Sequence, residues 1–120
     1  MNKLTTVLIS AAVIIGGVIA LPSKAMNVDG VNCLSFSACH ALLKDGSTWN
    51  ISGDWSSSGK LSVTRHNVNV IGNGAKLQYV TASGNNVTFR GFEVTGSPAG
   101  VNGIFWTGDG GLIENINCHD

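Results

Sequence analysis

The chain has 120 residues, of which 16 are glycine and 12% are charged, and its formal net charge at pH 7 is zero. This balance leaves no basic surface for a nucleic-acid backbone, so nucleic-acid binding is excluded as a function class.

The first 25 residues have the pattern of an export signal. Lys3 provides a short positive region, residues 4–21 contain no charge, and Ser23-Lys24-Ala25 offers small residues at a cleavage site. We predict a signal peptide over residues 1–25 and therefore a secreted or periplasmic protein. A retained membrane anchor is the alternative, because the uncharged run is just long enough to span hydrocarbon.

After cleavage, seven acidic and five basic side chains remain, so an anionic membrane would not attract the chain.

Residues 26–47 are predicted to form an N-terminal cap with a short helix inside the stretch 35–47. Ser37 is a suitable N-cap, Asp45-Gly46 is a stop signal, and one helical face would carry Ala38, Ala41 and Leu42. Repeat folds need such a cap because a bare end exposes apolar core and unpaired strand edge.

The three cysteines fit no metal site. Cys33 and Cys39 are six residues apart, and an oxidising compartment would allow a local disulfide between them. Cys118 is left over, and we interpret it as a small buried apolar side chain rather than a reactive thiol.

From residue 48 onward, an apolar rhythm of period two recurs at intervals of 19 and then 24 residues. Aligning "NVNVIGNG", "NVTFRGFEVTG" and "GGLIENINCHD" without gaps, with Trp49 and Ile51 one repeat earlier, gives these columns: Ile51, Val70, Phe89 and Ile113; Leu61, Val80 and Ile104; Val63, Ala82 and Trp106; and Ala75, Val94 and Cys118. Alternation is typical of strands with one buried face. The longer interval comes from an insertion at residues 96–102.

One further column contains residues that tolerate a left-handed backbone, and it predicts the bends: Gly53, Gly72, Gly91 and Asn115. Short strands separated by bends bury their inner faces only by stacking successive turns. We therefore predict an all-β fold, a parallel β-helix of about three to four turns over residues 48–120.

With "NNVTFRGFEVTGS", "NGIFWTGDGGLIENINCHD" and a helix before the first strands, the chain resembles the N-terminal part of a right-handed parallel β-helix of the pectate-lyase-like superfamily. The resemblance covers residues 35–120. It implies a protein that binds or degrades extracellular polysaccharide, as a lyase or glycoside hydrolase, with Ca²⁺ as an implied ligand. Its motifs specify the fold more than the function, and a non-catalytic structural or adhesin-like module is the alternative.

No catalytic residue can be assigned by this resemblance. The outward column on the first strand stack is Ser62, Thr81 and Phe105, with no carboxylate, and no carboxylate pair has the spacing of glycoside hydrolases. The candidates for substrate binding are Phe105, Asp109, Arg65 and His66. Asp109 is also a typical turn residue, and Phe105 could equally pack under a loop.

Other charged residues are interpreted mainly as structural. Arg90 and Glu114 share a column and would attract each other, and adjacent residues such as His119 and Asp120 point to opposite faces of a strand. The chain stops just after Cys118 without a polar cap. This suggests a fragment whose further turns hold any active site, or self-association through an uncapped end.

Overall fold

The computed structural model describes residues 24–95 and 103–119. The predicted signal peptide, apart from its last two residues, and the predicted insertion at 96–102 lie outside the described residues. Within the described part, no helix is both long and apolar enough to cross a membrane.

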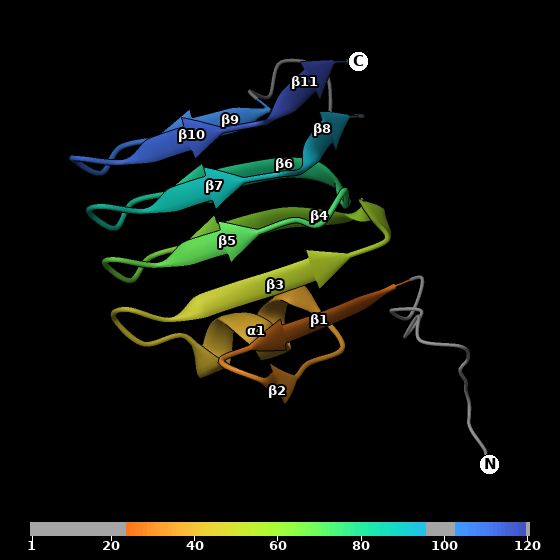
Figure 1. Cartoon of the computed structure of the whole chain (residues 1–120), viewed down its shortest axis with the longest axis horizontal. Coiled ribbons are helices and arrows are strands. Elements are labelled where there is room, and N and C mark those ends of the chain that lie inside the picture. The colour runs from red at the N-terminus through yellow and green to blue at the C-terminus, as the bar shows by residue number, and fades with distance from the viewer. Residues whose placement is uncertain (1–23, 96–102, 120) are drawn as a thin grey trace, which may run out of the picture.

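The described chain coils into a β-solenoid of about three turns (Figure 1). One sheet has the order β10-β7-β5-β3-β1-β2. Its strands are β1 (Ala25–Val28), β2 (Val31–Asn32), β3 (Thr48–Ser52), β5 (Asn69–Ile71), β7 (Thr88–Arg90) and β10 (Leu112–Glu114). The last four are mutually parallel, whereas β1 runs antiparallel to both β2 and β3. The predicted all-β parallel β-helix is confirmed.

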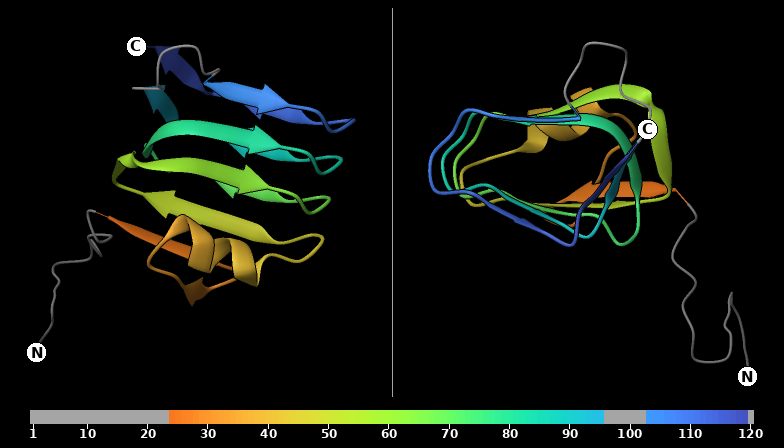
Figure 2. Two further views of the ribbon diagram at one scale, coloured as in Figure 1. Left: turned by 180° about the vertical axis from the view of Figure 1, so that it is seen from behind. Right: turned by 90° about the horizontal axis from the view of Figure 1, so that it is seen from above.

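The second sheet closes the coil and is parallel throughout. Its order is β11-β8-β6-β4, and β9 also pairs with β6. The strands are β4 (Asp54–Val63), β6 (Lys76–Ala82), β8 (Glu93–Thr95), β9 (Ile104–Trp106) and β11 (Asn117–His119). Seen from above, successive turns superimpose as one flattened ring (Figure 2).

Most of the predicted columns are confirmed by the strand register. Val70 pairs with Phe89 and Phe89 with Ile113. The two columns of the second sheet are also as predicted, with Leu61, Val80 and Ile104 in one and Val63, Ala82 and Trp106 in the other.

Two parts of the gapless alignment are wrong. Trp49, not Ile51, pairs with Val70, and Val94 pairs with Leu77 rather than with Ala75. The first difference comes from an irregularity in β4, whose register with β6 shifts between Trp55 and Lys60 and lengthens the first turn. The second comes from the corners between the sheets, which differ in length: residue 53 alone after β3, residues 72–75 after β5, and residues 91–92 after β7. A fixed repeat length cannot describe corners that vary.

All four predicted bend residues lie at corners between the sheets, with Asn115 at the corner after β10, but for two different reasons. Gly53, Gly91 and Asn115 have positive φ, at 92°, 77° and 54°. Gly72 does not have that backbone conformation. A Cβ there would lie 2.4 Å from the Cβ of Phe92 and 2.9 Å from the carbonyl oxygen of Gly91, so a close approach between turns requires glycine.

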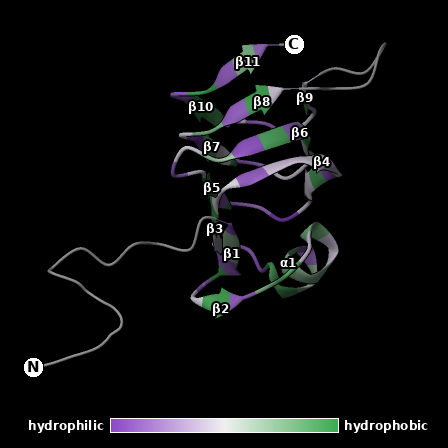
Figure 3. Ribbon diagram, turned by 90° about the vertical axis from the view of Figure 1, so that its right-hand side faces the viewer, coloured by the Kyte–Doolittle hydropathy of each residue, from purple (hydrophilic) through white to green (hydrophobic). Residues whose placement is uncertain are grey.

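The core is a continuous apolar column between the two sheets. Polar and apolar residues alternate along the stacked strands (Figure 3), which places one set of side chains inside. Phe89 packs edge-on against Phe92 and Trp106, with ring centroids 5.6 and 5.1 Å apart. The largest fully buried side chains are Trp49, Phe89, Met26, Ile51, Leu61 and Leu77.

A short helix, α1 (Phe36–Leu42), covers one end of this column, as predicted (Figure 2). Its N-cap is Ser35 instead of Ser37, since the Ser35 side chain accepts a hydrogen bond from the Ala38 N–H. The buried face is also different. Phe36 and Cys39 point inward, and the predicted Ala38 and Ala41 are exposed.

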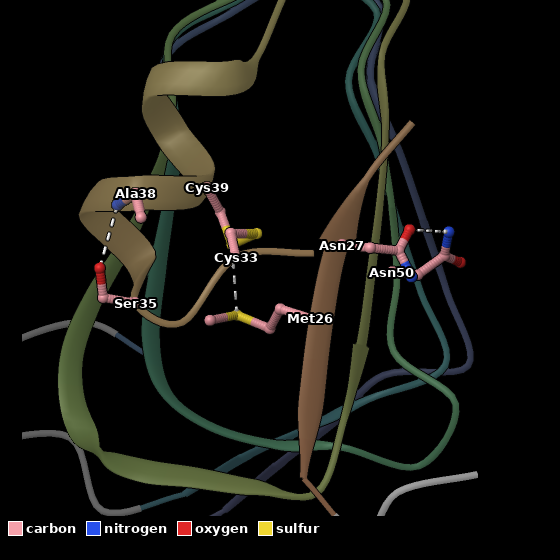
Figure 4. The surroundings of a disulfide bond; sticks show 7 residues. All are labelled: Met26, Asn27, Cys33, Ser35, Ala38, Cys39 and Asn50. Carbon is pink, nitrogen blue, oxygen red and sulfur yellow. Dashed lines mark hydrogen bonds between the residues drawn. A yellow bond between two sulfur atoms is a disulfide. The ribbon is translucent and has the colours of Figure 1, made fainter. Parts of the chain in front are cut away.

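The aromatic ring of Phe36 decides this orientation. It contacts the rings of Trp49 and Trp55, at centroid distances of 6.3 and 5.8 Å. A disulfide joins Cys39 of α1 to Cys33, next to β2, and holds the helix against the first strands (Figure 4). Cys118 is exposed, which contradicts the interpretation of a buried side chain.

Candidate functional site

The outer face of β4, β6 and β9 carries the column of polar and aromatic side chains that the sequence singled out. Ser62 pairs with Thr81, and Thr81 pairs with Phe105. The Thr81 hydroxyl donates a hydrogen bond to the Ser62 oxygen at 3.2 Å. The Phe105 ring is 52% exposed, so the column ends in an uncovered aromatic surface.

A second outward column lies beside the first and was not predicted. Lys60 on β4 pairs with Tyr79 on β6. Both residues lie two positions before members of the first column, so the period-two pattern that identified Ser62 and Thr81 would have found them too. The outer face therefore combines two hydroxyls, a phenol, an ammonium group and an exposed phenyl ring.

Toward the capped end, this face continues into a groove between α1 and β4. The groove has a volume of about 420 Å³ and is lined by Phe36, Ser37, His40, Lys60, Ser62 and Thr64. The His40 Nε2 and Thr64 Oγ1 atoms are 3.1 Å apart. Lys60 and Ser62 belong to both the face and the groove, which makes one continuous surface.

The other predicted candidates, Arg65, His66 and Asp109, lie in loops that stack beside this face (Figure 1). Their loops are joined by a chain of side-chain-to-backbone hydrogen bonds, which we call the loop ladder: Asp45, His66, Asn85 and Asp109. The His66 N–H donates to Asp45 Oδ1 at 3.0 Å, the Asn85 N–H to His66 Nδ1 at 2.9 Å, and the Asp109 N–H to Asn85 Oδ1 at 3.0 Å.

The loop ladder assigns a structural task to His66 and to the backbone of Asp109. Since His66 Nδ1 accepts a hydrogen bond, that nitrogen carries no proton in this arrangement. Arg65 is exposed, and its carbonyl oxygen lies directly against Gly84 on the next turn. The structure thus places Phe105 on the outer face and the other three candidates in the stacked loops.

The predicted Arg90–Glu114 pair and the His119 side chain both lie on the surface. Arg90 Nε lies 2.6 Å from Glu114 Oε1, and both side chains are about half exposed. His119 Nε2 contacts Glu93 Oε2 across adjacent turns, and Asp120 lies outside the described residues. Exposed pairs of this kind contribute little to stability.

The Ca²⁺ site implied by the resemblance has no matching set of ligands in the part of the chain described. There, no group of three or more histidine, cysteine or acidic side chains comes together. Ca²⁺ takes six to eight oxygen ligands, and the outer face offers hydroxyls without a carboxylate. We derive no role for a cation from these residues.

Shifted pKa values occur away from the outer face. Hydrogen bonds from the Thr48 N–H and the Ser47 hydroxyl lower the pKa of Asp29, and those from the Ser56 hydroxyl and N–H lower the pKa of Asp54. Partial burial raises the pKa of the Cys118 thiol. These two carboxylates stabilise turns, and in both the shift is away from the raised pKa that a general acid would need.

Comparison with known proteins found no matching family model, no matching curated protein and no matching solved structure. The chain is therefore assigned to an architecture, the β-solenoid, and not to a family.

Proposed function

We propose that this protein binds extracellular polysaccharide through the outer face of β4, β6 and β9, on a secreted solenoid scaffold. The observation that carries the proposal is the exposed Phe105 ring at the end of the Ser62–Thr81 hydroxyl pair. Sugars present apolar ring faces beside hydroxyl groups, so an aromatic plane next to hydroxyl donors and acceptors matches both parts of a sugar.

The shape of the face supports a chain-like ligand. Tyr79 and Lys60 add a second parallel column, and the groove beneath α1 extends the surface toward His40. Parallel strands set these columns at the spacing of adjacent strands, so the functional groups recur at a constant interval along the solenoid axis. A polymer with repeated hydroxyl groups can contact several of them at once.

Binding is proposed rather than turnover because of the chemistry of this face. A lyase needs a base beside the uronate carboxylate and a cation or hydrogen-bond donors for the developing charge, and a glycoside hydrolase needs two carboxyl groups. A uronate assay that follows the absorbance of the unsaturated product, with and without Ca²⁺, tests for lyase activity independently of binding.

The binding experiment uses the 120-residue chain in affinity electrophoresis against gels that contain acidic or neutral polysaccharides. We expect retardation by at least one polymer, and Phe105→Ala should weaken it about tenfold through loss of the aromatic contact. Leu34→Ala is the matched control, because Leu34 is 90% exposed, belongs to none of the three strands of the face and does not line the groove. Equal retardation of wild type and Phe105→Ala, or none with any polymer, would contradict the proposal.

The alternative function is a non-catalytic spacer or adhesin-like module. The loop ladder favours it, because the ladder engages His66 and the Asp109 backbone in stacking the turns. Absence of binding to every polymer, with an intact fold, is the result expected of such a module.

A further inference from the structure

A second cavity lies on the other sheet, near the capped end. It has a volume of about 240 Å³ and is lined by Ala25, Asn27, Asn32, Asn50, Ile51, Ser52 and Asn73. Since it is formed by β1, β2, β3 and the corner after β5, it is separate from the outer face described above.

Three of its asparagines form a row across three adjacent strands. Asn27 on β1 pairs with Asn32 on β2 and with Asn50 on β3. The neighbouring β1 residues Met26 and Val28 are buried, so alternation turns the Asn27 side chain outward. Figure 4 shows Asn27 and Asn50 together on the side of β1 away from Met26 and the disulfide.

The row is held in place by its surroundings. Asn50 Nδ2 donates a hydrogen bond to Asn27 Oδ1 at 3.3 Å, which orients both carboxamides. The Cys33 N–H donates to the Met26 carbonyl oxygen, and the Cys33–Cys39 disulfide fixes the segment that follows Asn32. The polar groups therefore sit on rigid strands, as a preorganised site requires.

The chemistry of the lining selects a class of ligand. Each carboxamide offers two N–H donors and an oxygen with two lone pairs, and one bond between Asn27 and Asn50 uses only part of this capacity. No side chain that lines the cavity is charged. A charged ligand would lose hydration without gaining a counter-ion, whereas neutral hydroxyl groups can both donate to and accept from amides.

We infer that this asparagine-lined cavity is a binding site for a neutral sugar ring, either a free monosaccharide or one unit of a neutral glycan. This site is independent of the proposed polysaccharide-binding face, because it lies on a different sheet and uses amides in place of aromatic rings. An experiment can therefore contradict one proposal and support the other.

The test is a titration of the ¹⁵N-labelled 120-residue chain, observed through the asparagine side-chain amide resonances. The probes are methyl glucoside and methyl galactoside, a linear neutral oligosaccharide, and sodium glucuronate as the charged comparison. We expect saturable shifts of the Asn27, Asn32 and Asn50 amides with the neutral probes. Tighter binding of the oligosaccharide would identify the glycan as the source, and equal binding would identify the free sugar.

Two variants keep the inference falsifiable. Asn32→Ala should weaken binding about fivefold through loss of one hydrogen bond, and it should not unfold the chain, because Asn32 is exposed. Asn117→Ala is the matched control, an exposed asparagine on β11 at the other end of the solenoid. Three results would overturn the inference. They are an equal shift of the Asn117 amide, glucuronate binding as tight as that of the neutral glycosides, and the absence of any saturable shift.

Discussion

At the scale of single residues, two glycines that the bend column did not include, Gly84 and Gly108, leave no room for a side chain against the backbone of the preceding turn. A Cβ added at Gly84 would lie 1.8 Å from the carbonyl oxygen of Arg65, and one added at Gly108 would lie 1.9 Å from that of Gly84. These three residues stack in successive loops. Bare backbone at Gly84 and Gly108 allows the loops to approach at strand spacing.

Gly84→Ala should therefore destabilise the protein by about 3 kcal/mol, because the methyl group must displace backbone rather than a flexible side chain. The measurement is denaturant unfolding. Gly74→Ala is the control: it has φ of 79° but open space around its Cβ position, so only the conformational cost of about 1 kcal/mol applies. Equal losses in the two variants would show that packing between loops is not the limiting factor.

Asp29 makes the first turn sensitive to acid. Its carboxylate accepts hydrogen bonds from the Thr48 N–H at 2.9 Å and the Ser47 hydroxyl at 2.7 Å, which lower its pKa. A carboxyl group with a pKa lowered by folding stabilises the folded state above its unfolded-state pKa. This contribution is lost as the pH falls through the folded-state pKa.

The melting temperature should therefore fall as the pH drops below about 4, the ordinary pKa of aspartate. Asp29→Asn keeps an acceptor oxygen without a titrating proton, and asparagine tolerates the positive φ of 51° at this position. The variant should show a smaller decrease between pH 5 and pH 2 in thermal unfolding followed by circular dichroism. The same pH dependence in variant and wild type would assign the acid sensitivity to other carboxylates.

At the scale of elements, the loop ladder connects the loop after α1 with the turns that follow β4, β6 and β9. Each hydrogen bond of the ladder needs a side chain that accepts from the backbone N–H of the next loop. Aspartate, histidine and asparagine each provide such an acceptor. Sequence comparison of the repeats missed the ladder because these three residue types share no hydropathy or size. They share only an acceptor atom at the right distance from the backbone.

His66→Asn should preserve the ladder, whereas His66→Ala should cost about 1 kcal/mol through loss of the acceptor for the Asn85 N–H. The free energy of unfolding of the two variants, measured in urea, provides the comparison. If both variants lose the same stability, the imidazole ring contributes through packing rather than as an acceptor.

At the scale of the whole molecule, burial decreases along the solenoid axis. Trp49 in the first turns is fully buried, whereas Leu112 and Ile113 on β10 are 49% and 47% exposed. In a stack where each turn contacts only its neighbours, local stability follows the number of neighbours that cover a turn. The described solenoid should thus be most stable near α1.

Amide hydrogen exchange should show this gradient in the 120-residue chain. We expect the slowest exchange in β3 and β5, and the fastest strand amides in β10 and β11, because local opening of the outer strands uncovers less apolar surface. Uniform protection across the sheets would indicate a single cooperative unit instead.

The solenoid and its main columns were predictable from the sequence, because side chains that alternate with period two are buried by any stacked arrangement. The column of Val70, Phe89 and Ile113, for example, could be predicted from the repeated pattern alone. Only the tertiary structure decided the length of each corner, the helix face that Phe36 turns inward, and the asparagine row across β1, β2 and β3. Each of these depends on contacts between turns, which hydropathy along one strand does not encode.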